Sequence, residues 1–471
     1  MKSKFFTIFS AFFFVICALP CLLIPFVSAD SSAENRELSE LPQPITEGKF
    51  NRAFFGEFSD YLSERFVFRN ELISLSGIMQ EKIFSSSAQK KVITGKDDWL
   101  FFNETLDDYT GKNPLDKRTI NNIASTLKML ETYLDKENTD FIFFVAPNKN
   151  TLYPEFMPSR YLKTKAPSNL ENLTASLIRK CVTYLDIQEL FANEDEILYH
   201  KRDSHWNNKG ALLATNALLK MLGKQESAYT CASAKTDLTW RGDLDKMLYP
   251  SLEKFDEQTV FDYTPTYEYA SNFQTADDIN IRTESEAAEG SLLMFRDSFG
   301  IAMLPFIAEE FAQMYYTRTI PFSMNLLKLT PADAVIIEIV ERNIINLQKY
   351  APVMPAPEAA PPPATEIPGN DTVNTRKTAG LIHIFGTVDE EFLGDENRIY
   401  VTISTQNGAK TYEAFPVYET DLPESEATGS NGFSLYIDAR EIPESGAEII
   451  ITTDSGSNRR KSPPLPLPVA E

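Results

Sequence analysis

The sequence predicts an α/β fold, with a mainly parallel sheet in one domain and a small all-β sandwich in a second. Between residues 95 and 349, apolar runs alternate with amphipathic segments, which is the pattern of strand–helix–strand units. Seven prolines then lie between Pro352 and Pro368, where neither a helix nor an inner strand can continue. After this cluster, short β-type segments follow one another without helical periodicity.

The length of the chain supports two folded units, and its charge argues against nucleic-acid binding. The chain has 471 residues, more than one packed core normally holds. Hydrophobic residues make up 43% and charged residues 24%, which is typical of globular proteins. The net charge is -22, and so acidic a chain repels phosphate backbones. We therefore expect no nucleic-acid partner.

Residues 1–29 predict export, either as a signal peptide or as an N-terminal membrane anchor. Lys2 and Lys4 precede an almost uncharged stretch that is long enough to span a bilayer. Residues 27–29 also have the small side chains of a cleavage site, so both interpretations stay open. Residues 30–94 form a helical lead-in. Its aromatic residues from Phe54 to Phe66 recur at helical spacing, and we expect them to pack on the next domain.

Residues 95–349 are predicted to form the α/β catalytic domain. Four strands are expected, and the first of them, at residues 140–146, is an almost continuous apolar run, as a strand covered on both faces requires. These strands are residues 140–146, 182–186, 292–295 and 334–340. Amphipathic spacing predicts helices at residues 119–134, 170–180 and 208–222, and a further one after the third strand up to Phe311.

The C-terminal part divides into a linker and a β-domain. Residues 350–376 are expected to be a surface-exposed linker of polyproline type. Residues 377–471 predict a β-sandwich accessory domain with a disordered tail. Its expected strands are residues 381–386, 398–404, 433–437 and 448–453.

The cysteines allow two interpretations. Cys181 and Cys231 lie beyond the apolar N-terminal segment, and they could form a disulfide in an oxidising compartment or be two unrelated buried thiols. The cysteines and histidines do not cluster as zinc ligands do, so no metal site is expected.

A catalytic base is easy to find, because the chain has only three histidines. His205 lies just before the predicted helix 208–222, whose N-terminal dipole is expected to favour the neutral imidazole. Asp203 is close enough in sequence to bind the other ring nitrogen and fix the tautomer. Taken alone, an Asp-x-His pair is more often structural than catalytic.

Ser298 is the candidate nucleophile. It follows the predicted strand 292–295 and opens a helix, so its hydroxyl should project from the carboxyl edge of the sheet. Backbone N–H groups at the start of that helix can stabilise an oxyanion. A serine at such a position is usually only a helix cap. Together with His205 and Asp203, however, Ser298 predicts a Ser-His-Asp triad.

The segment Asp-Ser-His-Trp-Asn at residues 203–207 resembles the signature of the DHHW proteins and of the alginate O-acetyltransferase (AlgX/AlgJ-type) family. Other segments fit the same resemblance, and it covers residues 34–349. These segments are residues 34–36, 66–69, 95–101, 146–149, 153–155, 242–244 and 296–299.

The resemblance implies a permuted SGNH-hydrolase-like fold, in which the Asp/His pair precedes the serine. It implies Ser298 as nucleophile, His205 as base and Asp203 as the residue that orients the base. The implied reaction passes an acetyl group through a Ser-linked acyl-enzyme to a hydroxyl of a cell-envelope or exported polysaccharide. The implied location is the outer face of the cytoplasmic membrane, anchored, or the exterior after secretion. A membrane-bound O-acyltransferase would supply the acetyl group, and no further cofactor is expected.

Five further residues are candidates for oxyanion or substrate contacts. Asn148 and Asn343 each follow a predicted strand and are candidates for a second oxyanion donor. Lys149 and Arg296 are candidates for binding an anionic acceptor. Trp206 could stack on a sugar ring or pack beneath the histidine.

Two competing interpretations concern the surroundings of the nucleophile. Lys149 and Arg296 could each form a salt bridge in place of a substrate contact, for example Arg296 with Glu338 or Glu341. Asp297 adjoins the nucleophile and rivals Asp203 as the residue that polarises the site. We rank Asp203 first.

Two other functions are compatible with the residues. An esterase could use the same triad, because transfer and hydrolysis differ only in the access of water to the acyl-enzyme. A glycan-binding envelope protein with an inactive site is the second alternative. The C-terminal domain departs from the alginate enzymes, so the identity of the acceptor does not follow from the resemblance.

Overall fold

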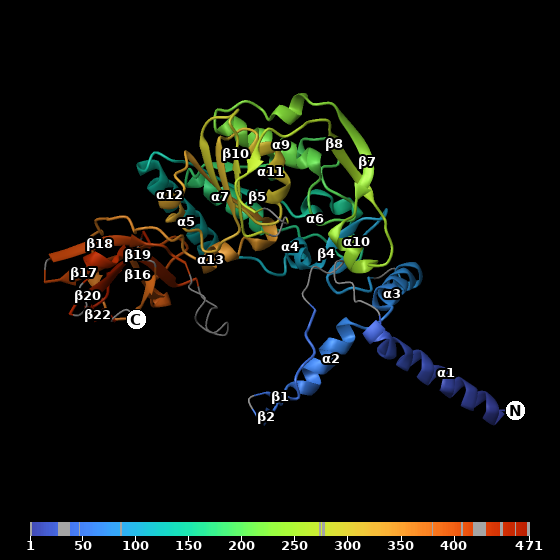
Figure 1. The fold of residues 1–471 in the computed structure, drawn as a ribbon. Coiled ribbons are helices and arrows are strands. Elements are labelled where there is room, and N and C mark those ends of the chain that lie inside the picture. The colour runs from blue at the N-terminus through green and yellow to red at the C-terminus, as the bar shows by residue number, and fades with distance from the viewer. Residues whose placement is uncertain are drawn as a thin grey trace.

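A computed structural model describes most of the chain (Figure 1). The described residues are 2–26, 38–46, 48–84, 87–272, 275, 278–378, 380–406, 408–417, 430–442, 446–456 and 458–468. The predicted cleavage site at residues 27–29 and the family-like segment at residues 34–36 lie outside this set.

A seven-stranded sheet forms the centre of the larger domain, with strand order β6-β5-β13-β11-β12-β10-β9. The first five strands in this order are mutually parallel, while β10 and β9 are antiparallel at one edge. The mainly parallel sheet is thereby confirmed. The strands are β5 Asp140–Ala146, β6 Tyr184–Leu185, β9 Glu268–Tyr269, β10 Asn280–Glu284, β11 Ser291–Phe295, β12 Gln313–Thr317 and β13 Ala334–Val340.

Helices cover both faces of this sheet and bury alternate residues of each strand (Figure 1). Phe141, Phe143 and Val145 of β5 pack with one helical layer, and the residues between them pack with the other. This explains why the central strands are mostly apolar. The first layer has α5 Lys117–Lys136, α7 Asn169–Arg179 and α13 Asn346–Lys349, and the second has α8 Ile187–Ala192, α9 Asn208–Met221 and α11 Leu304–Ala308.

Local capping explains where the long helices begin. Asp116 caps α5 by accepting from the Thr119 N–H, and Asn207 caps α9 in the same way. Ser168 and Glu171 form a capping box at α7. The helix predicted up to Phe311 is shorter than expected. A 3-10 turn, η5 Gly300–Met303, leads into α11, which ends at Ala308.

Smaller elements surround the carboxyl edge of the sheet. The hairpin of β3 and β4 places the start of this domain at Val92, slightly before the predicted boundary at residue 95. The two-stranded arm of β7 and β8 lies outside the central sheet. These elements are β3 Val92–Thr94, β4 Leu100–Phe102, α4 Leu106–Thr110, α6 Lys149–Leu152, β7 Ala234–Trp240, α10 Asp243–Leu248, β8 Asp256–Phe261, α12 Leu326–Leu329 and η6 Glu341–Asn343.

The N-terminal helices differ from the expected packed lead-in. The helix α2 has no buried residue, and its aromatic rings stack mainly on one another. The expected packing on the next domain is therefore wrong for α2. By contrast, α3 contacts α10, and Ser74 Oγ on α3 accepts from the N–H of Ser251, which follows α10. The elements are α1 Lys2–Leu23, β1 Ile45–Thr46, β2 Lys49–Phe50, α2 Phe54–Glu64 and α3 Arg69–Phe84.

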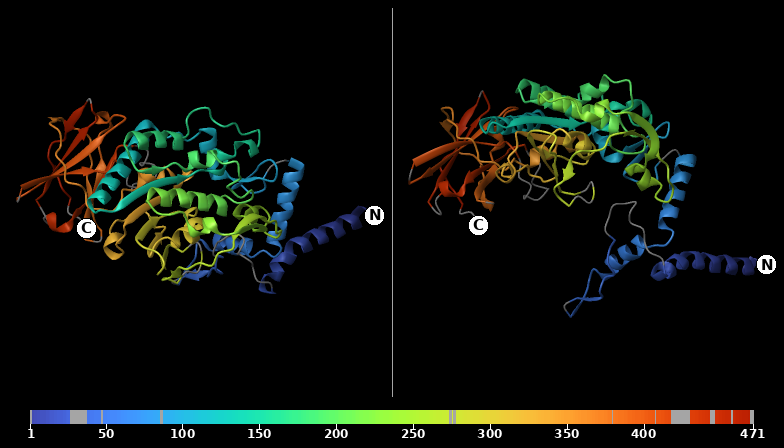
Figure 2. Two further views of the ribbon diagram at one scale, coloured as in Figure 1. Left: turned by 90° about the horizontal axis from the view of Figure 1, so that it is seen from above. Right: turned by 45° about the horizontal axis from the view of Figure 1, so that its top comes forward.

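The helix α1 points away from the body of the molecule, at the end opposite the β-domain (Figure 2). Among the helices of the described residues, α1 included, none combines the length and apolarity that crossing a membrane requires. Whether residues 1–29 act as a signal peptide or an anchor stays a prediction.

The C-terminal region is a two-sheet β-domain, as predicted. A six-stranded sheet and a three-stranded sheet share one core, to which Ile384, Leu435, Val401 and Ile451 contribute. Residues 459–468 add β21 and β22 to the larger sheet, so the expected disordered tail is wrong for them. The strands are β14 Thr365–Glu366, β15 Asn374–Thr378, β16 Leu381–Thr387, β17 Arg398–Thr405, β18 Gly408–Ala414, β19 Gly432–Asp438, β20 Glu448–Asp454, β21 Arg459–Lys461 and β22 Leu465–Pro466.

The predicted linker is partly buried, and this corrects the expectation of an exposed spacer. Residues 351–354 are buried in the same apolar core as β5 and α5. Leu381, Phe415 and Tyr436 of the β-domain belong to that core too. Apolar residues between the prolines explain the difference, because an extended segment can bury them between two domains. Only the later part of the segment is largely exposed.

Neither interpretation of Cys181 and Cys231, a disulfide or two buried thiols, agrees with the structure. Cys181 and Cys231 are both exposed and free. The disulfide interpretation is therefore wrong for this structure.

Candidate active site

The predicted triad is assembled at the carboxyl edge of the central sheet. Nε2 of His205 lies 2.9 Å from Oγ of Ser298. Nδ1 of the same ring lies 2.7 Å from Oδ1 of Asp203. Ser298 lies on the turn after β11, and the other two residues lie in the loop before α9. These distances match those of a serine nucleophile, its general base and the carboxylate that orients the base.

The protonation of His205 departs from the helix-dipole expectation. Burial alone would lower the pKa of His205, but the hydrogen bond and charge of Asp203 outweigh it and raise the pKa overall. The carboxylate therefore dominates the dipole of α9. Burial opposes ionisation of Asp203 as well, yet hydrogen bonds from His205 hold the pKa of Asp203 below its usual range. The pair is thus organised as a carboxylate beside a basic imidazole.

Both oxygens of Asp203 are fixed by donors. Oδ1 accepts from the backbone N–H of His205 at 2.9 Å as well as from its ring. Oδ2 accepts from the indole Nε1–H of Trp240 at 3.0 Å and from the backbone N–H of Asp243 at 2.9 Å. Four donors on one buried carboxylate keep it ionised and prevent it from rotating.

Residues 200–206, here named the base loop, are held from below by Lys149. This side chain is buried, and its Nζ donates to the backbone carbonyls of His200, Lys201 and Asp203 at 3.0, 3.0 and 2.5 Å. Burial lowers the pKa of Lys149 to about 8. The expectation that Lys149 binds an anionic acceptor is therefore wrong, because the ammonium is engaged inside the protein.

A buried ion pair holds the other side of the base loop. Nε of Arg202 lies 2.7 Å from Oδ1 of Asp245 on α10, and both side chains are almost fully buried. The backbone N–H of Arg202 also donates to Asp256 on β8 at 2.6 Å. The base loop is thus tied to α10 and β8, which lie outside the sheet.

Residues 296–300, here named the nucleophile turn, are held by two carboxyl groups. Asp297 accepts from the Phe299 N–H at 2.9 Å and from the Val340 N–H at 2.7 Å. Glu338 on β13 accepts from the N–H groups of Asp297 and Gly300. Burial raises the pKa of Glu338 well above its usual range, and the hydrogen bond to Asp297 supports the protonated form. Asp297 therefore anchors this turn and does not bind His205.

Two further sequence candidates have structural contacts. Arg296 is 4% exposed, and its guanidinium donates to the carbonyls of Asp297 and Asp278, so it is not open to an acceptor. Trp206 is 2% exposed, and its Nε1–H donates to the Phe299 carbonyl at 3.1 Å. Trp206 therefore packs beneath the site, which confirms one of its two interpretations and excludes sugar stacking.

The oxyanion donors are only partly placed by the structure. Within the described part of the chain, the backbone N–H of Ser298 has no hydrogen-bond partner, so it is available to an incoming carbonyl oxygen. Asn148 is buried, and its amide donates to Asp108 at 3.4 Å rather than toward Ser298. Asn343 is half-buried in η6, at the same edge of the sheet. Its role stays a prediction.

Arg342 is a charged group that the sequence reasoning did not single out. Its guanidinium carbon lies 5.8 Å from the centre of the Phe299 ring and 5.3 Å from that of Phe102. Its charge acts against protonation of His205. Among the described residues it has no carboxylate partner, so it is suited to negative charge that arrives with substrate.

Asp203, His205 and Asp243 also come within 4.8 Å of one another through their ligand-type atoms. Each of these side chains already has a hydrogen-bond partner. Asp243 accepts from the backbone and side chain of Ser204 at 2.8 and 2.5 Å. A cation bound to Nδ1 of His205 would displace Asp203, so this cluster fits the triad better than a metal site.

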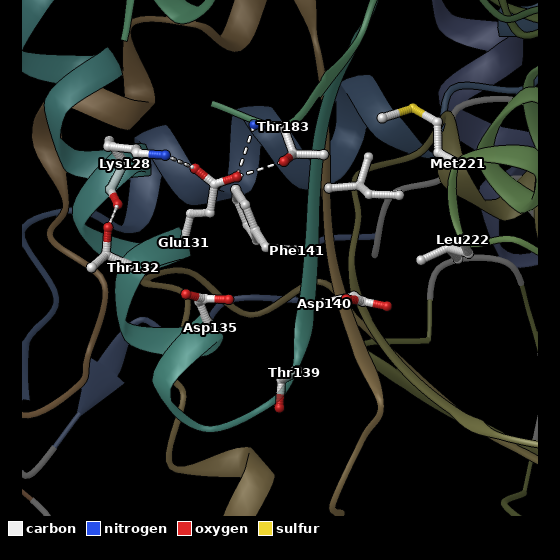
Figure 3. Close-up of a pocket in the computed structure, with 11 residues that line it drawn as sticks. Lys128, Glu131, Thr132, Asp135, Thr139, Asp140, Phe141, Thr183, Met221 and Leu222 are labelled. Atoms are coloured by element: carbon white, nitrogen blue, oxygen red, sulfur yellow. Dashed lines mark hydrogen bonds and ion pairs between the residues drawn. The ribbon is translucent and has the colours of Figure 1, made fainter. Parts of the chain in front are cut away.

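A pocket beside α5 lies away from the triad. This cavity of about 350 Å³ is located where β5 begins, at the amino edge of the sheet (Figure 3). Two of its charged groups pair with each other, since Glu131 accepts from Lys128 at 2.8 Å, and Glu131 also accepts from the Thr183 hydroxyl at 2.6 Å. No nucleophile–base pair lies among its lining residues, so we do not assign the reaction to it.

Comparison with known proteins identifies the type of domain. Residues 92–287 match the family described as SGNH hydrolase-like domain, acetyltransferase AlgX. This segment includes Asp203 and His205 and ends before Ser298. No curated protein matches the sequence.

Three solved structures are similar to this chain at low sequence identity. Bacillus cereus PatB1 is 18% identical, with 54% of this chain and 96% of that protein covered and a TM-score of 0.44. A DHHW family protein from Eubacterium siraeum is 16% identical, with 48% and 87% covered and a TM-score of 0.38. The O-acetyltransferase domain of Pseudomonas putida AlgJ is 16% identical, with 54% and 92% covered and a TM-score of 0.36.

Proposed function

We propose that this chain, of which residues 92–287 match the family described as SGNH hydrolase-like domain, acetyltransferase AlgX, is an extracytoplasmic polysaccharide O-acetyltransferase. The acetyl group passes through an ester on Ser298 to a hydroxyl of a cell-envelope or exported polysaccharide. The observation that carries this proposal is the continuous hydrogen-bonded line from Ser298 through His205 to Asp203.

The first half of the reaction loads the enzyme. His205 Nε2 takes the proton of Ser298 while Oγ attacks the carbonyl carbon of the donor acetyl ester. The negative charge that develops on the carbonyl oxygen is stabilised by the Ser298 N–H. The imidazolium, stabilised by Asp203, then gives its proton to the leaving alcohol of the donor. The acetyl group remains as an ester on Ser298.

The second half unloads the enzyme onto a sugar. A hydroxyl of the acceptor gives its proton to His205 Nε2 as its oxygen attacks the acetyl-Ser298 carbonyl. Collapse of the tetrahedral intermediate returns the proton to Ser298 Oγ and releases the acetylated sugar. Arg342, beside Phe299, is positioned to attract a negatively charged part of the donor or acceptor.

The donor and the location are further parts of the proposal. A membrane-bound O-acyltransferase would present the acetyl group at the outer face of the cytoplasmic membrane. The apolar segment of α1, preceded by Lys2 and Lys4, supports export of the remainder of the chain. Cell fractionation of a C-terminally tagged chain tests this, and recovery in the cytoplasm contradicts it.

Hydrolysis is the alternative that one observation favours. The His205 side chain is 24% exposed, so water can approach the triad as well as a sugar can. An esterase would release acetate from the same acyl-enzyme. A non-catalytic glycan-binding protein would not form that acyl-enzyme at all.

One experiment separates the three functions. The purified full chain is incubated with a chromogenic acetyl ester, with and without oligosaccharide acceptors. Acetylated oligosaccharide that depends on Ser298 supports transfer, whereas acetate alone supports the esterase. Intact-mass analysis of the enzyme checks for the acetyl group on Ser298. If the wild-type protein shows no such adduct even under conditions that slow deacylation, both catalytic functions are wrong.

A further inference from the structure

Trp240 contacts the triad without taking part in the chemistry described above. It is the last residue of β7, on the arm outside the central sheet. Its Nε1–H donates to Oδ2 of Asp203 at 3.0 Å. Its ring stacks on the buried His200 ring, with the centres 4.9 Å apart and the planes 6° from parallel. The indole is thereby held in one orientation, with its N–H directed at the carboxylate.

The position of this donor decides what it can do. Oδ1 of Asp203 must face Nδ1 of His205 if the imidazole is to keep the tautomer that accepts the Ser298 proton. A carboxylate rotates about its bond to Cβ unless its other oxygen is held too. Oδ2 is held by Trp240 and by the backbone of Asp243. Trp240 supplies the side-chain part of that restraint, and it comes from a different element than the triad.

We propose that Trp240 is a positioning residue that fixes the orientation of Asp203 and, through it, the tautomer of His205. The consequence for the reaction rests on the proposed function, while the orientation of Asp203 does not. The β7–β8 arm then becomes part of the catalytic architecture, although none of its side chains touches the reacting atoms.

The indole N–H of Trp240 can be removed without changing the size of the side chain. Replacement of Trp240 by 3-benzothienylalanine exchanges the N–H for sulfur and keeps the size and stacking of the ring. The variant Trp240→Phe keeps an aromatic ring and also lacks the donor. Leu238→Ala is the matched control, because Leu238 lies on the same strand and is 67% exposed.

The first measurement is the rate of acylation of Ser298 by a chromogenic acetyl ester. We expect both donor-deleted proteins to lose about tenfold in kcat with little change in KM, because a hydrogen bond to a charged group is lost. Leu238→Ala should behave as wild type. A loss confined to KM for the ester or the sugar would make Trp240 a substrate contact and overturn the positioning role.

The second measurement is a double-mutant cycle with Asp203→Asn. If Trp240 acts through Asp203, Trp240→Phe causes little further loss once the carboxylate is gone. Fully additive losses would overturn the proposal, because Trp240 would then act by another route.

The third measurement does not need an active enzyme. The Nδ1–H proton of His205, bonded to a carboxylate, gives a far-downfield proton NMR signal in the full chain. We expect this signal to shift or broaden on deletion of the Trp240 donor and to stay unchanged in Leu238→Ala. An unchanged signal overturns the positioning role even if no acetyl donor works. Conversely, a shifted signal without an acyl-enzyme contradicts only the proposed function.

Discussion

The base loop and the nucleophile turn bring the triad together, but they are held in place by different means. The nucleophile turn lies directly on β11 and is tied to the neighbouring strand β13 by Asp297 and Glu338. The base loop is held by hydrogen bonds from residues that lie far apart in sequence, among them Lys149 and Trp240. The sheet therefore positions the nucleophile, whereas side chains from outside it position the base. Substitutions in the base loop and in the nucleophile turn should distinguish residues that take part in the reaction from residues that hold these segments in place.

The largest effect is expected from removal of the nucleophile. Ser298→Ala deletes the oxygen that forms the acyl-enzyme, so acetyl transfer should fall by at least about ten-thousandfold with no loss of stability. Ser291→Ala, at the other end of the same strand, is the control and should stay near wild type. Turnover by Ser298→Ala above one-tenth of the wild-type rate would contradict the assignment.

The next effect compares one carboxylate from each region. Asp203→Asn should lower kcat by about a thousandfold to ten-thousandfold, because His205 loses the partner that fixes its tautomer. Because the pKa of His205 is raised, the acid limb of the wild-type pH–rate profile should lie at a higher pH than an unperturbed histidine would give. Without the charge of Asp203 this limb should move to lower pH.

The matching substitution in the nucleophile turn should act differently. Asp297→Asn keeps the side-chain shape but places an amide beside N–H groups, so we expect a lower melting temperature and a milder loss of kcat. The comparison is made by thermal unfolding and pH–rate profiles of both variants. If Asp297→Asn moved the acid limb and Asp203→Asn did not, the roles of the two carboxylates would be reversed.

A smaller effect is expected from the support beneath the base loop. Lys149→Met leaves three backbone carbonyls without their donor, which should lower the free energy of unfolding by about 3 kcal/mol and kcat by about tenfold. Lys201→Met changes an exposed lysine in the same loop and should have little effect. Urea unfolding and ester turnover provide the two readouts. Equal effects of the two variants would mean that the buried ammonium does not support the loop.

The smallest effect concerns the pH dependence of stability at the nucleophile turn. Glu338 keeps its proton in the folded protein because its pKa is raised there, so the folded state binds more protons than the unfolded state. Its contribution to stability is therefore full below the ordinary pKa of about 4.3 and is lost as the pH rises through the folded pKa, by at most about 1.4 kcal/mol per pH unit.

Glu338→Gln imitates the protonated form and should flatten this decline. Urea unfolding between pH 5 and 9, chosen as roughly the window above the ordinary pKa, measures it. Glu341, whose pKa burial raises to about 7, remains as an internal reference with the same sign. Identical slopes for wild type and variant would mean that Glu338 is already ionised in the folded state.

The sequence predicted the central strands of the sheet more completely than the elements around them. The strands β5, β11 and β13 were predicted because burial on both faces makes them largely apolar. The strands β10 and β12 were missed. Only alternate residues of β10 are buried, which is a weaker signal. β12 is buried at all but its first position, but its mixed polar and aromatic residues are not a continuous apolar run.

The same limit applies to the site. Asp203 and His205 are two residues apart, and Ser298 follows a recognisable strand, so local patterns identified them. Trp240 and Arg342 reach the site only through the fold, and local patterns do not record such contacts. Lys149 was assigned to substrate because the sequence does not show that its ammonium points inward, to the base loop carbonyls.

The apolar core shared by the two domains has a consequence for how the chain is made. Ala351 and Met354 pack with Tyr436, so the face that the β-domain covers is unprotected until that residue has left the ribosome. At roughly 5–20 residues per second, this leaves the sheet domain with an uncovered apolar face for several seconds. A nascent chain in that state is a natural client for chaperones. Premature stop codons anywhere in the last hundred or so residues should therefore yield aggregation rather than a shorter enzyme.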